Sequence, residues 1–183
     1  MGLLLIEQAF NGLQFGVMLF LIAAGLTLVF GIMDLVNLSH GSLVMVGAYL
    51  ATTLIEWTGS FILGILLALP STFLVGVVVE IVVLRTLYER DHLDQVLATF
   101  GLILFFNELI RIVWGPASLY SGLPESISGH VEILPGVPYP AFRLLIILVG
   151  LLVALLIYFI VARTKLGMLI RAGASNREMA GAL

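Results

Sequence analysis

A short polar segment between two apolar stretches contains the residues most suited to chemistry. It interrupts the run GLTLVFGIMDLVNLSHGSLVMVGA, residues 25–48, and contains no Lys or Arg. Its polar and small residues are Asp34, Asn37, Ser39, His40, Gly41 and Ser42. An imidazole with a carboxylate nearby can accept and release protons, and amide and hydroxyl groups can bind a polar solute. Acid–base catalysis and solute recognition are therefore the two chemistries to compare.

The helix that follows this break must include part of it. Only residues 43–57 remain before the next polar turn, which is roughly 22 Å of helix against a hydrocarbon thickness of ~30 Å. The helix is therefore expected to begin near Leu38, with Asn37, Ser39 and His40 inside the membrane or at its inner boundary. Polar groups at that depth need protein or water partners, so we expect them to face an interior path rather than lipid.

Composition predicts an all-α, polytopic helical membrane protein. Hydrophobic residues make up 61% of the chain and charged residues 10%, with a mean hydropathy of +1.20. Soluble domains carry about 25% charged residues, so a soluble fold is excluded. The absence of Cys excludes disulfides, thiolate metal sites and cysteine nucleophiles.

Five membrane spans are predicted, one of them short. They cover residues 9–33, 38–57, 61–84, 96–114 and 142–162. A charged connector, residues 85–95, joins the third and fourth. Residues 115–141 contain five of the six prolines and cannot form a membrane helix. Within this loop, residues 131–137 predict a small hairpin around a Pro135-Gly136 turn.

The predicted fourth span contains Asn107, Glu108 and Arg111. Glu108 and Arg111 are three residues apart and share a helix face, so they can pair. A structural ion pair facing neighbouring helices is the favoured interpretation, and a position along a solute path is the alternative.

The basic residues predict the orientation. Six of the eight fall on one side of a five-span chain, which positive-inside logic makes cytoplasmic. They are Arg85, Arg90, Arg163, Lys165, Arg171 and Arg177. The N-terminus and the loop 115–141 are then extracytoplasmic. Residues 163–183 are cytoplasmic and contain a predicted amphipathic helix, capped by Ser175 or Asn176, that docks onto a partner.

Two segments together resemble a known family. The run GLTLVFGIMDLVNLSHGSLVMVGAY and the closing RTKLGMLIRAGASNREMAGAL are similar to the permease subunits of bacterial ATP-binding-cassette importers for branched-chain amino acids. The resemblance spans essentially the whole chain. Family members continue through further spans, so the chain resembles an N-terminal portion of such a permease, an incomplete transmembrane domain.

The resemblance implies a division of labour among several chains. The expected partners are ATPase subunits, a second permease subunit (identical or a sister) and an extracytoplasmic amino-acid-binding protein, in the bacterial inner membrane. No GxxxxGK[ST] phosphate loop occurs, so ATP hydrolysis is expected on the partner chains. No cofactor, metal, catalytic residue or nucleic-acid partner is expected, and lipid surrounds the chain.

The resemblance supports the importance of the break and of the closing segment, and the residues themselves suggest the following roles as hypotheses. The translocation path or gate is expected to include Asp34, Asn37, Ser39, His40, Gly41, Asn107 and Glu108. Coupling to the ATPase is expected to involve Arg171, Ala172, Asn176, Glu178 and Ala180. The helix start after Asn37 offers free N–H groups and a positive dipole end, which suit a substrate carboxylate.

Several alternatives stay open at this point. Asn37, Ser39 and Ser42 can simply cap and hold the helix, with His40 bonded to Asp34 or to a backbone carbonyl. The cargo can be urea or a short amide, and a passive channel is a further option. An intramembrane enzyme is disfavoured because His40, His92 and His130 fall in three separate segments and cannot meet at one metal.

Overall fold

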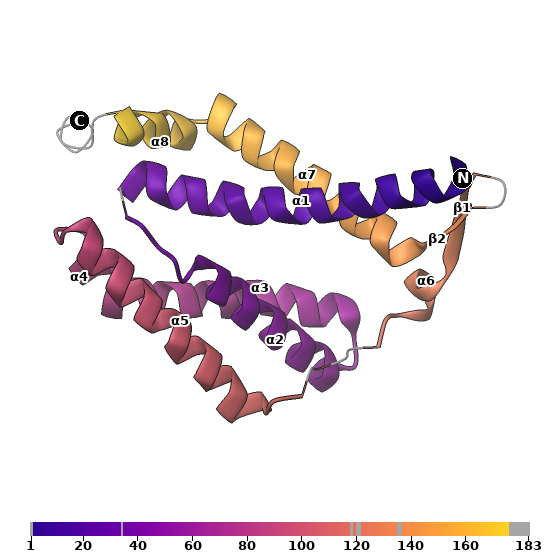
Figure 1. The fold of residues 1–183 in the computed structure, drawn as a ribbon, viewed down its shortest axis with the longest axis horizontal. Coiled ribbons are helices and arrows are strands. Elements are labelled where there is room, and N and C mark those ends of the chain that lie inside the picture. Colours follow the sequence, from indigo (N-terminus) through magenta and orange to yellow (C-terminus); the bar gives the residue numbers. More distant parts are fainter. Residues whose placement is uncertain (1, 34, 118, 120–121, 135–136, 176–183) are drawn as a thin grey trace. The chain divides into compact units, whose positions relative to one another are not determined.

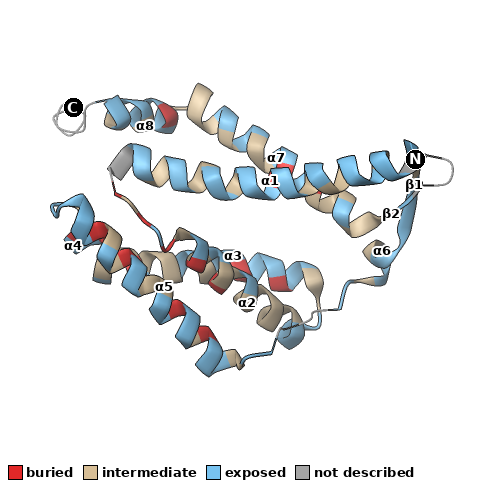
Figure 2. Cartoon of the chain, in the orientation of Figure 1, coloured by how far each residue is buried: buried red, intermediate tan, exposed pale blue. Residues whose placement is uncertain are grey.

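The computed structural model describes residues 2–33, 35–117, 119, 122–134 and 137–175 (Figure 1). The chain divides into two compact units. One consists of residues 1–32 and 123–183, and the other of residues 33–122. Most side chains of both units are exposed or half-buried (Figure 2), including many Leu, Ile and Phe residues. An apolar surface of this extent is expected for helices that face lipid.

The first unit is built on two long apolar helices, α1 (Gly2–Met33) and α7 (Ala141–Arg163). Val17 of α1 packs directly against Gly150 of α7, where a side chain larger than hydrogen has no room. Between them in sequence lie a single helical turn, α6 (Glu125–Ser128), and the strands β1 (His130–Leu134) and β2 (Val137–Pro140). A short helix, α8 (Lys165–Ser175), follows α7.

The second unit is a group of packed helices. Its elements are α2 (His40–Thr58), α3 (Phe61–Val79), the π-helical segment η1 (Glu80–Leu84), α4 (Arg85–Leu87) and α5 (His92–Trp114). The segments α3, η1 and α4 follow one another without a break, so Phe61–Leu87 is one long apolar helix. The connector predicted for residues 85–95 is therefore shorter, because the preceding helix continues to Leu87 and α5 begins at His92.

Helices α2 and α3 form a tight antiparallel hairpin. Gly59, with a φ of 63°, ends α2 in the left-handed conformation that favours glycine. The Ser60 hydroxyl then accepts from the backbone N–H of Leu63 and caps α3. Farther along, Gly64 lets the backbone of α3 approach that of α2 at Ile55. Small residues at a crossing point allow this close packing in membranes.

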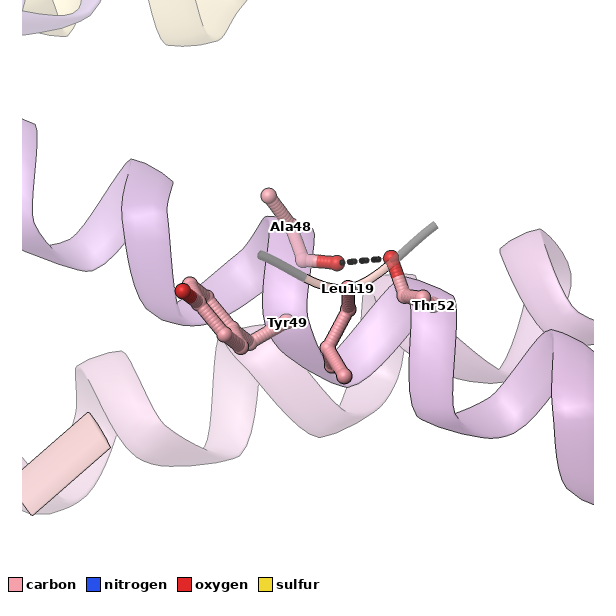
Figure 3. Close-up of a pocket in the computed structure, with 4 residues that line it drawn as sticks. All are labelled: Ala48, Tyr49, Thr52 and Leu119. Atoms are coloured by element: carbon pink, nitrogen blue, oxygen red, sulfur yellow. Dashed lines mark hydrogen bonds between the residues drawn. The ribbon is translucent and has the colours of Figure 1, made fainter. Parts of the chain in front are cut away.

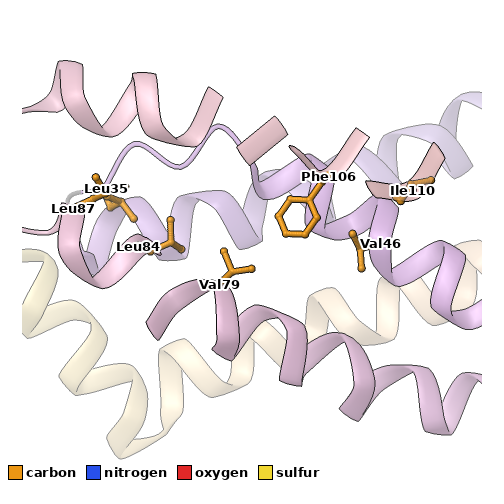
Figure 4. Close-up of a cluster of buried hydrophobic side chains, with 7 residues drawn as sticks. All are labelled: Leu35, Val46, Val79, Leu84, Leu87, Phe106 and Ile110. Atoms are coloured by element: carbon orange, nitrogen blue, oxygen red, sulfur yellow. The ribbon is translucent and has the colours of Figure 1, made fainter. Parts of the chain in front are cut away.

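An apolar cluster connects the helices of the second unit (Figure 4). It consists of Leu35, Val46, Val79, Leu84, Leu87, Phe106 and Ile110. These residues come from α2, α3, η1, α4, α5 and the segment before α2. Leu35 is fully buried although it lies outside any helix, which fixes that segment on its apolar side.

The predicted all-α, polytopic membrane fold is confirmed. In the described part of the chain, four helices are long and apolar enough to cross a membrane: Leu4–Gly31, Phe61–Leu87, His92–Trp114 and Ala141–Arg163. The predicted short span corresponds to α2, which is not among these four. It begins at His40 rather than near Leu38, and its 19 residues extend about 28 Å.

The hairpin predicted in the proline-rich loop is also confirmed. Strands β1 and β2 pair in antiparallel register, with His130 opposite Pro140 and Val131 opposite Tyr139. A register shift separates Glu132 from Leu134. The predicted Pro135-Gly136 turn lies outside the described residues.

The predicted coupling segment contains the described helix α8, and the alternative cap at Asn176 lies outside the described residues. Ser175 was expected to cap the start of a helix, whereas it is the last residue of α8. The described helix is therefore Lys165–Ser175, and residues 176–183 lie outside the described part.

Candidate functional site

The break before α2 is held by two buried polar side chains. Asn37 is 3% exposed and Ser39 is fully buried. The backbone N–H and the hydroxyl of Ser39 both donate to Asn37 Oδ1, at 3.0 and 2.7 Å. The chain then turns into α2, whose first regular bond runs from Leu43 N–H to the Ser39 carbonyl at 3.1 Å. Asn37 and Ser39 therefore satisfy each other and shape the helix start.

The first turn of α2 keeps polar groups without protein partners. Because its hydroxyl bonds Asn37, Ser39 does not cap the helix with its side chain. Among the described residues, the N–H groups of Gly41 and Ser42 have no hydrogen-bond acceptor, and the His40 ring has no hydrogen bond. His40 is half-buried and Gly41 is exposed, whereas Ser42 is buried. Asp34, predicted beside them, lies outside the described residues.

A buried glutamine that the sequence interpretation missed fixes this break to α5. Gln95 is 2% exposed, and its Oε1 accepts from the backbone N–H of Val36 at 3.1 Å. Its Nε2 donates to the carbonyls of Leu87 at 3.2 Å and Arg90 at 3.1 Å. Thr99, one turn later, is also buried, and its Oγ1 lies 3.3 Å from the Val36 carbonyl oxygen. A polar amide directly before the predicted fourth span is a signal for such a contact, although the sequence analysis places Gln95 in the connector 85–95.

Asn107 and Glu108 do not join this cluster. Both are exposed on α5, twelve and thirteen residues after Gln95, which is roughly 18–20 Å along the helix. Arg111 is exposed as well, and across the described ranges no ion pair connects it to Glu108. The expected structural pair is therefore not formed here.

A small pocket lies beside α2. It has a volume of about 150 Å³ and is lined by Ala48, Tyr49, Thr52 and Leu119 (Figure 3). The Thr52 hydroxyl is already engaged with the Ala48 carbonyl at 3.0 Å. The ring of Trp114 of α5 lies tilted against that of Tyr49, at 5.4 Å between ring centroids, and its Nε1 donates to Thr53 Oγ1 at 2.8 Å. This wall of the pocket is thus rigid and mostly apolar.

In the first unit, Asn11 holds the strand pair against α1. Its Oδ1 accepts from the Tyr139 hydroxyl at 3.1 Å and from Arg143 Nη1 at 2.7 Å. Tyr139 is fully buried, and its ring lies 5.6 Å from that of Phe10. The hairpin is consequently a fixed part of this unit.

The start of the coupling segment is joined tightly to α7. The Thr164 hydroxyl accepts from Gly167 N–H at 3.2 Å and caps α8. Gly167 is buried against the carbonyls of Ile160 and Val161, and Arg171 Nη1 donates to the Val161 carbonyl. Ala172 is exposed. The other predicted coupling residues, Asn176, Glu178 and Ala180, lie outside the described residues.

The arrangement brings together polar residues at the break before α2. Within the described ranges, no three His, Asp or Glu side chains lie close enough to share a metal ion. The described polar groups at the break are amides, hydroxyls, backbone N–H groups and the His40 ring.

Comparison with known proteins identifies the family. Residues 8–183 match the model of the branched-chain amino acid transport system permease component. The chain belongs to this family. Membership of a permease family agrees with the prediction of a transporter subunit.

Individual relatives carry matching names. The chain is 28% identical to the high-affinity branched-chain amino acid transport system permease protein BraD of Pseudomonas aeruginosa, over 97% of this chain and 62% of the relative. It is 26% identical to the corresponding LivH protein of Escherichia coli, over 97% of this chain and 61% of the relative. It is 29% identical to a probable LivH permease of Methanocaldococcus jannaschii, over 89% of this chain and 53% of the relative.

This permease component spans 53–62% of the length of these relatives. No solved structure matches it. The family and its apolar helices make the chain a multi-pass membrane protein.

Proposed function

We propose that this chain forms the translocation path of an ATP-driven importer for branched-chain amino acids, as a permease subunit in the bacterial inner membrane. The family match over residues 8–183, on a chain with four span-length apolar helices, carries this proposal. Energy comes from separate ATPase subunits, and an extracytoplasmic binding protein delivers the amino acid. A second permease subunit completes the path. The names of the relatives, which refer to branched-chain amino acid transport, favour an amino-acid cargo over urea or a short amide.

The start of α2 is the proposed contact for the cargo. A free amino acid carries a carboxylate. The N–H groups of Gly41 and Ser42, which have no acceptor among the described residues, lie at the positive end of a helix dipole. The half-buried His40 adds a ring with no protein hydrogen bond within the described residues. Asn37 and Ser39 act indirectly, because their polar atoms shape the turn. Asp34 belongs to the same proposed gate.

Asn107 and Glu108 are proposed to line the path at a different depth. They are exposed polar residues in an apolar membrane helix, and such residues face water or protein rather than lipid. Their distance of roughly 18–20 Å along α5 from Gln95 places them far from the break. They therefore serve a second polar position on the path.

The segment from α8 onward is proposed to contact the ATPase on the cytoplasmic side. Exposed Leu166, Met168 and Leu169 and the basic Lys165 offer a mixed surface suited to docking on a protein. Ala172, Asn176, Glu178 and Ala180 extend this contact, and Arg171 holds the helix to α7. The N-terminus and residues 115–141 are then extracytoplasmic, where the hairpin serves the binding protein.

Transport in a defined system tests the proposal. The permease, its sister subunit and the ATPase subunits are reconstituted in proteoliposomes and supplied with the binding protein. Uptake of labelled leucine is expected to require ATP, and an excess of unlabelled isoleucine or valine is expected to compete, whereas acetamide and urea are not. Leucine uptake that proceeds equally without ATP would indicate a passive channel and contradict the proposal.

A further inference from the structure

One buried side chain, Gln95, connects three segments that are separate in sequence. Its oxygen holds Val36, in the non-helical segment before α2. Its nitrogen holds the carbonyl of Leu87, the last residue of α4, and that of Arg90, in the turn before α5. All of these atoms belong to the second unit, residues 33–122.

The same segment is fixed on its apolar side as well. Leu35 is fully buried in the cluster that also contains Leu84 and Leu87 (Figure 4). Thr99 lies one helical turn after Gln95, and its hydroxyl donates to the backbone carbonyl of Gln95 at 2.7 Å. The break before α2 and the turn before α5 therefore share both an apolar and a polar connection.

Burial makes the polar connection strong. Because Gln95 is only 2% exposed, water cannot replace the hydrogen-bond partners of its amide. If this one side chain becomes apolar, three backbone groups lose a hydrogen bond, although the Leu87 carbonyl still accepts from the Arg90 N–H at 3.1 Å. In addition, His92 Nδ1 lies 3.4 Å from Gln95 Oε1, so the first turn of α5 is part of the same contact.

We propose that Gln95 is a positioning residue of the importer, which makes the turn before α5 and the break before α2 move as one body during transport. This inference rests on the proposed function. The turn presents the exposed side chains of Glu89, Arg90 and Asp91, on the side predicted to be cytoplasmic. A displacement of this turn is transmitted through Gln95 to Val36, and from there to His40 at the start of α2.

A thiol in the break reports on this connection independently of transport. The chain contains no Cys, so Ser39→Cys gives a single labelling site that is nearly isosteric and fully buried. The rate of maleimide modification is measured in the assembled importer, alone and combined with Gln95→Leu, Gln95→Glu or Glu89→Gln. Glu89→Gln is the matched control, because Glu89 is exposed in the same turn and its side chain has no contact in the described structure.

Gln95→Leu is expected to speed modification about tenfold or more, the factor that corresponds to one ordinary hydrogen bond. Without the reporter cysteine, it is expected to lower the leucine taken up per ATP hydrolysed, at an unchanged amount of assembled importer. Gln95→Glu keeps the acceptor for Val36 but sets a carboxylate oxygen against the carbonyls of Leu87 and Arg90, so it is expected to speed modification as well. Glu89→Gln is expected to leave the modification rate unchanged. If Gln95→Leu fails to assemble, Gln95→Glu decides by the same two measurements.

Two results would overturn the inference. Unchanged modification in the Gln95 variants means that this amide does not hold the break. Faster modification with unchanged uptake per ATP means that the break is held but that its position does not govern coupling. A parent importer without ATP-dependent uptake contradicts the proposed function instead, and the modification rates then still decide whether Gln95 holds the break.

Discussion

At the scale of single residues, the polar side chains around the start of α2 fall into two groups, according to whether they hydrogen-bond to the protein. Asn37, Ser39, Gln95 and Thr99 are buried and engaged with the protein. His40 is half-buried and has no hydrogen bond from its ring in the described part of the chain. One sequence motif thus contains residues that build the turn and a residue, His40, whose ring has no hydrogen-bond partner among the described residues.

Asn37→Ala is expected to destabilise the protein by about 1–3 kcal/mol. The substitution leaves the buried N–H and hydroxyl of Ser39 without their common acceptor. Thermal unfolding of the detergent-solubilised protein measures this as a lower midpoint temperature. Asn107→Ala, the same change at an exposed position of α5, is the matched control. Equal midpoints for the two variants would show that the Asn37 bonds do not matter for stability.

At the scale of elements, close backbone contacts at glycine decide how helices meet. Gly64 lies against Ile55 in the α2–α3 hairpin, Gly150 against Val17 in α1 and α7, and Gly167 against Val161 at the start of α8. Each contact lies inside one of the two units. Gly12 and Gly16 of α1, by contrast, form a GxxxG pair without such a contact. A Cβ added at either position would have no atom of another described segment within 4 Å.

Gly64→Ala tests the α2–α3 hairpin. A Cβ at this position falls 2.6 Å from both the Cα and the N of Ile55, so two backbones have to separate. Overpacking of this kind costs about 1–3 kcal/mol, which lowers the midpoint of thermal unfolding. Gly76→Ala lies on the same helix with nothing within 4 Å, and we expect it to be neutral or slightly stabilising. A midpoint for Gly64→Ala as high as that of Gly76→Ala would contradict this packing.

Gly167→Ala tests whether α8 is fixed to α7 for coupling. The added methyl group meets the carbonyls of Ile160 and Val161, which belong to the backbone and cannot rotate away. We expect α8 to shift and the ATPase subunits to be retained less well during affinity purification, with the membrane helices still folded. Gly101→Ala, in an open position on α5, serves as the control. Full retention of the ATPase subunits with Gly167→Ala would show that the position of α8 does not matter for binding them.

At the scale of the whole molecule, hydropathy alone predicted most of the fold. The predicted span 142–162 differs from α7, Ala141–Arg163, by one residue at each end, because it is an uninterrupted apolar run. The Pro-Gly pair between β-branched residues likewise predicted the hairpin. These features depend on local sequence, so single-sequence patterns are sufficient to find them.

Features that depend on distant partners were missed. The start of α5 was placed at Val96, because His92, Asp94 and Gln95 are polar, yet they form its first turn after Asp91. The Gln95–Val36 bond joins residues 59 positions apart, and no local pattern predicts it. The Glu108–Arg111 pair was predicted from helical spacing, although spacing permits a pair without requiring one.

The central claim is that the start of α2 lies at membrane depth on the solute path. Its most direct test is the reaction of a membrane-impermeant maleimide with a single thiol introduced by His40→Cys in the complete importer in proteoliposomes, compared with Glu89→Cys in the exposed turn before α5. We predict that the thiol at position 40 reacts far more slowly than the one at position 89, and that saturating leucine slows it further. Equal rates at the two positions, unaffected by leucine, would contradict the account.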